Sequence, residues 1–438
     1  MREQIKKWLA YAVEHQGLRR YGSNVLWLMG EKSVRLLLGL LVGIYVARQL
    51  GPAQYGLLNY AISFVAIFSV IGSLGMDAIT VRELVRHPEK SDSLLGTAFC
   101  LKLCGFAGMV VILAGILLFS PMDFAAKLLI GVILSGYAFQ TLQILDSYFQ
   151  SRVLSRYTVI SQLGALLIIS AFRLYLAWKQ APLWTFAVAE AGYMGLSAAG
   201  YAASYLFLGG RFRRWNYDAP TAKFLFRESL PLLFSGAASM IYIRIDQVMV
   251  TWMLGDAANG QYAVAVRIVE ILYLVPLAVE SSFFPSLIGT RGTSLRRYYR
   301  RTEQLMRSMF YFALLLVIPA SLGGRWAIEW LYGPAYYTGA LLYSVFAFKI
   351  LLVYPGLICG KWYIAENLQS LSMWISIAGA GFNIAANYFL ILRYGVFGAV
   401  YATILTSFCV NFIFPLPFRK GRQAVRLLLR ALLPAFSI

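Results

Sequence analysis

The sequence predicts an all-α integral membrane protein with 12 transmembrane helices in two six-helix lobes, related by a pseudo-twofold axis along the membrane normal. Three observations support this fold class: an apolar composition, basic residues in alternate connectors, and an internal repeat. Hydrophobic residues make up 60% of the 438 residues and charged residues only 13%, with a mean hydropathy of +0.66. A soluble chain of this length needs a far more polar surface, so we expect most of the chain to lie in a membrane.

The expected spans are apolar stretches long enough to cross a bilayer, for which a helix needs about 20 residues. In chain order they cover residues 23–48, 55–76, 94–119, 124–148, 157–178, 183–208, 225–254, 258–289, 304–323, 337–358, 370–392 and 396–416. The chain therefore divides into a cytoplasmic amphipathic segment (1–22), an N-terminal lobe (23–208), a basic cytoplasmic linker (209–224), a C-terminal lobe (225–416) and a basic amphipathic cytoplasmic tail (417–438).

Basic residues are concentrated in every second connector and at both ends of the chain. The opposite connectors hold little beyond Lys127, Lys179, Arg325 and Arg393. The positive-inside rule then places both termini and the basic connectors in the cytoplasm. It also accounts for the net charge of +20 without a nucleic-acid partner. The basic connectors and tail include Arg211, Arg213 and Arg214; Arg296, Arg297, Arg300 and Arg301; and Arg419, Lys420, Arg422, Arg426 and Arg430.

The tail has the pattern of an amphipathic helix. Its arginines recur at helical spacing, and Val425, Leu428, Leu429 and Leu432 form a second, apolar stripe. Basic amphipathic helices bind anionic membrane surfaces, so we expect this helix to lie on the cytoplasmic surface.

A short motif occurs twice, six spans apart and on the same outer side. Leu50-Gly51-Pro52-Ala53-Gln54-Tyr55-Gly56 follows the first span, and Leu254-Gly255 through Gly260-Gln261-Tyr262 follows the seventh. Both read Leu-Gly, a short turn, then Gly and Tyr as the next span begins. Copies in matching positions indicate two halves with parallel orientation.

The order of several motifs resembles that of bacterial polysaccharide flippases of the Wzx type. These belong to the multidrug/oligosaccharidyl-lipid/polysaccharide (MOP) exporter superfamily, which also holds multidrug (MATE) exporters and lipid II flippases. The similar stretches are Asn24–Trp27 with Glu31, Lys32 and Arg35; Leu50–Gly56; Gly75-Met76-Asp77 with Val81–Leu84; Leu331–Tyr336; and Asn383 and Asn387 followed by Tyr394–Ala399.

The resemblance implies a MATE-like transporter in the bacterial cytoplasmic (inner) membrane, not an enzyme, with no cofactor. Its substrate would be an undecaprenyl-pyrophosphate-linked oligosaccharide, such as the O-antigen unit of lipopolysaccharide. The transporter would move this substrate to the outer leaflet by alternating access through a cationic central cavity. Membrane lipids and membrane polysaccharide-assembly proteins are the other partners that it implies.

Charged residues inside the spans are candidates for the substrate site, because a charge at the centre of a span costs about 2.5–3.5 kcal/mol on insertion scales. We expect Arg35, Arg244 and Arg267 to hold the pyrophosphate, since the guanidinium fork makes paired bonds to phosphate oxygens. Internal ion pairing is the alternative, because Arg35 is four residues from Glu31 and Arg267 three from Glu270. Supporting or ion-coupling roles are expected for Glu31, Lys32, Arg173, Asp246, Glu270, Glu280 and Lys349.

Aromatic and amide side chains suit the faces and hydroxyls of sugars. Tyr45, Tyr242, Asn383 and Asn387 are therefore candidates for the glycan path, with ordinary helix packing as the alternative. With four cysteines, no CxxC motif and two histidines, the sequence predicts neither a metal site nor a disulfide framework.

Three rival functions fit the sequence less well. A glycan polymerase or ligase would need a sizeable catalytic outer loop, and the outer connectors are mostly a few residues long. A drug exporter would need a cavity for amphipathic cations, which central arginines disfavour. Lipid II flippases usually have 14 spans. The driving force stays open between protons, sodium and the membrane potential.

Overall fold

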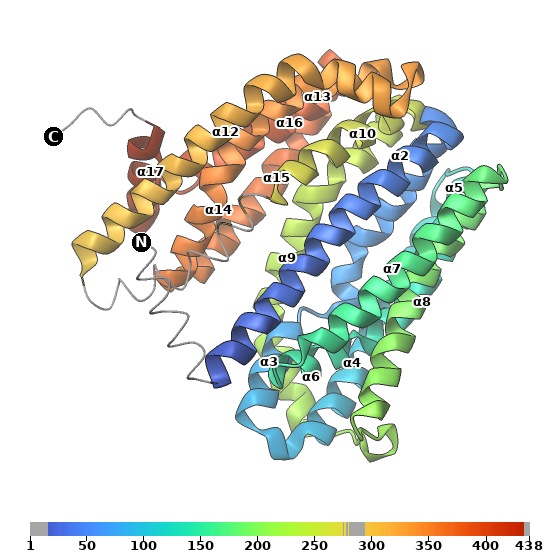
Figure 1. Cartoon of the computed structure of the whole chain (residues 1–438), viewed down its shortest axis with the longest axis vertical. Helices are drawn as coiled ribbons and strands as arrows, with labels where there is room; N and C mark the ends of the chain where they lie inside the picture. The colour runs from blue at the N-terminus through green and yellow to red at the C-terminus, as the bar shows by residue number, and fades with distance from the viewer. Residues whose placement is uncertain (1–15, 275, 277–278, 280–293, 433–438) are drawn as a thin grey trace. The chain divides into compact units, whose positions relative to one another are not determined.

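The computed structural model describes residues 16–274, 276, 279 and 294–432, which form helices joined by short connectors (Figure 1). No strand occurs in these ranges, and the expected all-α fold is confirmed. By length and hydropathy alone, eight of the helices in the described part are able to cross a membrane. Glu280 and the segment 1–15 lie outside the described residues.

Each expected span overlaps a described helical segment. Those up to residue 207 are α2 (Gln16–Ser73, bent at Gly51), the short α3 (Asp77–Arg86), α4 (Ser91–Phe119), α5 (Phe124–Gln140), α6 (Ile144–Ser151), α7 (Ser155–Trp178) and α8 (Leu183–Phe207). Then come α9 (Ala219–Leu254), α10 (Asp256–Leu272), α12 (Leu295–Tyr332), α13 (Tyr337–Phe346), α14 (Ile350–Ala365), α15 (Gln369–Tyr394), α16 (Val396–Phe408) and α17 (Arg419–Leu432).

The chain forms two compact units. The first comprises residues up to 42 together with 68–233, and the second comprises 43–67 together with the residues from 234 onward. In the first unit α8 packs against both α5 and α7, and Figure 1 shows the three helices side by side. In the second unit α12 packs against α13 and α14, and α15 packs against α16.

Three helices begin directly after a glycine in the same unusual conformation. Gly51, Gly255 and Gly333 have φ of 70°, 88° and 90° with ψ of 171°, 172° and 170°. Only glycine adopts this region readily, because it has no Cβ. The next residue is Pro52, Asp256 or Pro334; a proline is already preorganised for the first helical position, and an aspartate complements the helix dipole there.

The two copies of the repeat lie against each other within the second unit. A Cβ on Gly56 would lie 1.8 Å from the carbonyl oxygen of Asp256, and one on Gly260 would lie 2.0 Å from that of Pro52. The side chain of Asn259 donates a hydrogen bond to the Gly56 carbonyl at 2.8 Å. The second glycine of each copy therefore permits direct contact with the backbone of the other copy.

The basic tail forms α17, which packs against α12 and α14. Val425 and Leu428 of its apolar stripe are 5% and 1% exposed. These two side chains are thus covered by protein rather than lipid, which corrects the expectation of a helix lying with this stripe on the membrane. Leu429, the adjacent member of the stripe, remains exposed.

Candidate substrate and ion sites

Arg35 belongs to the first unit, where α2 and α7 position it. Its Nε donates to Glu31 Oε1 at 2.5 Å, and its guanidinium also donates to Gln162 Oε1. The Tyr193 ring lies 5.8 Å from the guanidinium carbon, and Gln162 in turn donates to the Tyr201 hydroxyl at 2.5 Å. The expected pairing with Glu31 is therefore present. The Arg35 side chain nevertheless remains 40% exposed.

Arg173 pairs with a residue that the sequence did not link to it. Its guanidinium contacts the carboxylate of Glu190, joining α7 to α8. This ion pair neutralises both charges within the first unit, which favours a supporting role for Arg173. Lys32 is exposed.

Arg244 and Arg267 share a single carboxylate in the second unit. The nearest guanidinium nitrogens of the two arginines lie 4.0 Å and 3.9 Å from Glu270 oxygens. Arg244 comes from α9, and the other two residues come from α10. The three side chains are between 26% and 36% exposed. Two cations beside one anion leave an excess positive charge, and each guanidinium carries five donors.

Asp246, also on α9, is the centre of a buried polar network. It is 4% exposed, and its carboxylate accepts hydrogen bonds from Tyr262 at 2.9 Å, Thr403 at 2.5 Å and Asn387 at 2.7 Å. The donors come from α10, α16 and α15. Lys349 lies close enough to interact electrostatically with this carboxylate and with Glu270.

Two of the residues expected on the glycan path belong to this network. Asn383 and Asn387 are both fully buried. The Asn383 side chain donates to the Thr406 hydroxyl at 3.3 Å, and the backbone carbonyl of Asn383 accepts from the Asn387 side chain at 2.9 Å. Both amides are therefore held by protein partners here, and their role toward sugars stays a prediction. Within the described part of the chain, neither amide Oδ1 has a hydrogen-bond partner.

The tyrosines expected on the glycan path are partly buried. Tyr242 forms a hydrogen bond of 2.9 Å with Ser407, and its ring lies 5.9 Å from the Lys349 ammonium. Tyr45 on α2 is likewise of intermediate exposure. Their role toward sugars stays a prediction.

Sequence reasoning did not single out Lys102, a buried charge within α4. This side chain is 2% exposed, and its ammonium donates to Asp77 Oδ1 at 2.5 Å. The signal was available, because a lysine interrupts the apolar stretch 94–119. No group of three or more His, Cys, Asp or Glu side chains able to hold a metal ion occurs among the residues that the structure describes.

Comparison with solved structures defines the class of this fold. The structure resembles an inward-facing multidrug resistance MATE family transporter of the MOP superfamily (TM-score 0.71, 15% identity, covering 91% of this chain and 96% of that one). It resembles the lipid II flippase MurJ in an inward closed conformation to the same degree (0.71, 14%, 93% and 91%). A MOP superfamily transporter from Pyrococcus furiosus is also similar (0.61, 16%, 93% and 96%). The fold is that of MOP superfamily transporters.

The sequence then identifies the family. Residues 21–288 match the polysaccharide biosynthesis protein family, which is more than half of the chain, and the chain belongs to this family. The expected resemblance is confirmed at the level of family and fold. No curated protein matches the sequence significantly.

Proposed function

We propose that this protein moves an undecaprenyl-pyrophosphate-linked oligosaccharide, a unit of O-antigen or a similar surface polysaccharide, from the cytoplasmic to the outer leaflet by alternating access. On this proposal it is a multi-pass protein of the bacterial inner membrane with both termini in the cytoplasm. Membership of the polysaccharide biosynthesis family supports the substrate class. The observation that carries the proposal is the arrangement of Arg244 and Arg267 around one carboxylate.

The excess charge beside Glu270 suits a pyrophosphate. Each guanidinium has five donors in a planar fork that matches phosphate oxygens. The distances of 4.0 Å and 3.9 Å to Glu270 exceed those of a hydrogen bond, so a phosphate would gain contacts that the carboxylate does not make. That Arg35 also contacts the head group stays a prediction, because its guanidinium already binds Glu31 and Gln162.

Drug export or lipid II transport is the alternative within the same fold. The equal TM-scores of 0.71 for the MATE transporter and the lipid II flippase do not choose between them. Two arginines with one carboxylate favour an anionic substrate over an amphipathic cation, because like charges repel. The family match favours a polysaccharide intermediate.

Alanine substitution tests the head-group site. R244A and R267A should each slow flipping of the lipid-linked oligosaccharide in proteoliposomes by about 10- to 100-fold, the equivalent of a charged hydrogen bond worth about 1.5–3 kcal/mol. R325A is the matched control, since Arg325 also pairs with a glutamate, Glu329, at 3.0 Å and is more exposed. The proposal is wrong if R244A and R267A flip the substrate as fast as R325A and the unchanged protein do.

We also propose that the Asp246 network couples transport to an ion. A buried carboxylate with neighbouring hydroxyls and amide oxygens is able to bind a proton or a small hard cation. The supporting roles of Glu31, Lys32, Arg173, Glu270 and Lys349 stay predictions, as does that of Glu280.

D246N tests the coupling. It removes the charge while retaining a side chain of similar size. The variant should still bind the lipid-linked substrate but should lose the stimulation of flipping by a proton or sodium gradient. D123N is the control, because Asp123 is an exposed connector residue. A gradient should stimulate flipping by D123N as it does for the unchanged protein. If a proton or sodium gradient still stimulates flipping by D246N, the coupling site lies elsewhere.

A further inference from the structure

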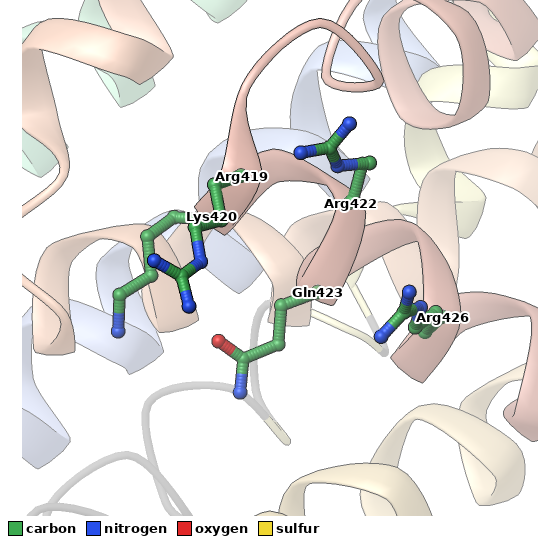
Figure 2. Close-up of a pocket in the computed structure, with 5 residues that line it drawn as sticks. All are labelled: Arg419, Lys420, Arg422, Gln423 and Arg426. Atoms are coloured by element: carbon green, nitrogen blue, oxygen red, sulfur yellow. The ribbon is translucent and has the colours of Figure 1, made fainter.

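The exposed side of α17 carries a strongly basic hollow that the proposed transport site does not use. The hollow has a volume of about 630 Å³. Figure 2 shows its five lining side chains, all of them from this one helix: Arg419, Lys420, Arg422, Gln423 and Arg426.

α17 is firmly attached to the rest of the second unit. Its buried face packs against α12 and α14. Gly421 lies so close to the preceding turn that a Cβ there would be 2.0 Å from the carbonyl oxygen of Pro415. At the other end of the helix, Arg307 of α12 donates to the carbonyl oxygen of Arg430 at 2.8 Å. The backbone that carries the basic side chains of the hollow is therefore fixed to the second unit.

The charge of the hollow is poorly compensated. Lys420 pairs with Glu366 at 3.6 Å. In the described part of the chain, no carboxylate lies within ion-pair distance of Arg419, Arg422 or Arg426. Three arginines on neighbouring turns repel one another, and this repulsion is relieved when an anion binds between them.

We propose that this hollow binds the head group of a membrane lipid that carries two phosphates. Three guanidiniums without a carboxylate partner among the described residues match two phosphates better than one, and Gln423 adds an amide donor. Leu416, Phe418 and Leu429 are each at least 44% exposed and lie beside or on the helix. Apolar side chains next to basic ones favour a lipid over a soluble phosphate. The ligand is either a polyprenyl pyrophosphate or a phospholipid with two phosphodiesters.

Binding to the purified full-length protein in detergent tests the proposal. The probes are undecaprenyl pyrophosphate, cardiolipin and, as the lipid with one phosphate, phosphatidylglycerol. R422Q/R426Q should weaken binding of at least one two-phosphate lipid by 10-fold or more. R213Q/R214Q is the matched control, since it removes the same charge from the exposed connector before α9, and should bind normally. E366Q, which removes the carboxylate beside Lys420, should tighten binding several-fold, a gain that misfolding cannot produce.

The pattern of binding decides the outcome. Preference for undecaprenyl pyrophosphate assigns the hollow to the carrier of the transported sugar, and preference for cardiolipin assigns it to a structural phospholipid; both support the site. The proposal is overturned if phosphatidylglycerol binds as tightly as the other two, or if R213Q/R214Q loses as much affinity as R422Q/R426Q. Because the assay measures binding without transport, its result is independent of the flipping experiments above.

Discussion

Buried charges in this protein are placed beside partners that stabilise them. Lys102 has Asp77, and Asp246 has three hydrogen-bond donors. The half-buried Arg173 likewise has Glu190. An isolated charge at the centre of a span costs about 2.5–3.5 kcal/mol on insertion scales, so each partner has a stability role whatever else it does. Arg244 and Arg267 are different, because they share one carboxylate at long range.

The Lys102–Asp77 pair provides a residue-scale prediction. D77N leaves the buried ammonium without its anion and should lower the free energy of unfolding by about 2 kcal/mol. The double variant D77N/K102M removes the charge as well and should recover most of that loss, since methionine fills the space of the lysine stem. Thermal unfolding in detergent measures both effects. Equal stability of D77N and the unchanged protein would show that the pair contributes nothing.

At the scale of elements, the repeated glycine motif does two separate things. Its first glycine, Gly51 or Gly255, turns the chain at positive φ so that a new helix begins at once. Its second glycine, Gly56 or Gly260, lets the two new helices touch through their backbones. On the proposed topology this contact lies on the outer side of the membrane, where alternating access requires a junction that closes and opens.

Substitution of Gly260 tests the contact. G260L places a side chain where only 2.0 Å separates a Cβ from the Pro52 carbonyl oxygen, so the two helices must separate. Overpacking of this kind costs about 1–3 kcal/mol. G131L in α5 is the control, because a Cβ there meets no atom within 4 Å. We expect G260L to lose thermal stability and flipping while G131L keeps both. If the two variants behave alike, the contact is not required.

At the scale of the whole molecule, the distribution of charge predicts the orientation in the membrane. Under the positive-inside rule, the connector with Arg211, Arg213 and Arg214 faces the cytoplasm and the connector around Asp123 faces outward. This direction also fits the energetics: a potential of 100 mV, negative inside, favours outward movement of a pyrophosphate by about 2.3 kcal/mol per negative charge.

Cysteine labelling measures the orientation. In a version without the four native cysteines, D123C should react with a membrane-impermeant maleimide in intact spheroplasts. R213C should react only after the membrane is permeabilised. Both positions are exposed, so a difference in labelling reports sidedness rather than burial. The reverse pattern would invert the proposed direction of transport.

Much of the fold was predictable, and much less of the site was. The spans follow from hydropathy and length, because a helix in lipid must satisfy its own backbone and present apolar side chains. Local spacing also predicted the Glu31–Arg35 pair. It did not predict that Arg173 meets Glu190, or that Asn387 binds Asp246, which is 141 residues away. Such contacts depend on the relative rotation and depth of separate helices, which hydrophobicity along one helix does not specify.

A helical membrane protein with a repeat, basic alternate connectors and a few charges in its spans follows from the sequence, because bilayer thickness and charge act on each segment separately. Which of these charges have close partners became clear from the packing of the helices. It placed Asn383 and Asn387 in a buried polar network, and it turned Val425 and Leu428 of the apolar stripe of α17 toward protein. Those outcomes depend on which faces of neighbouring helices pack together.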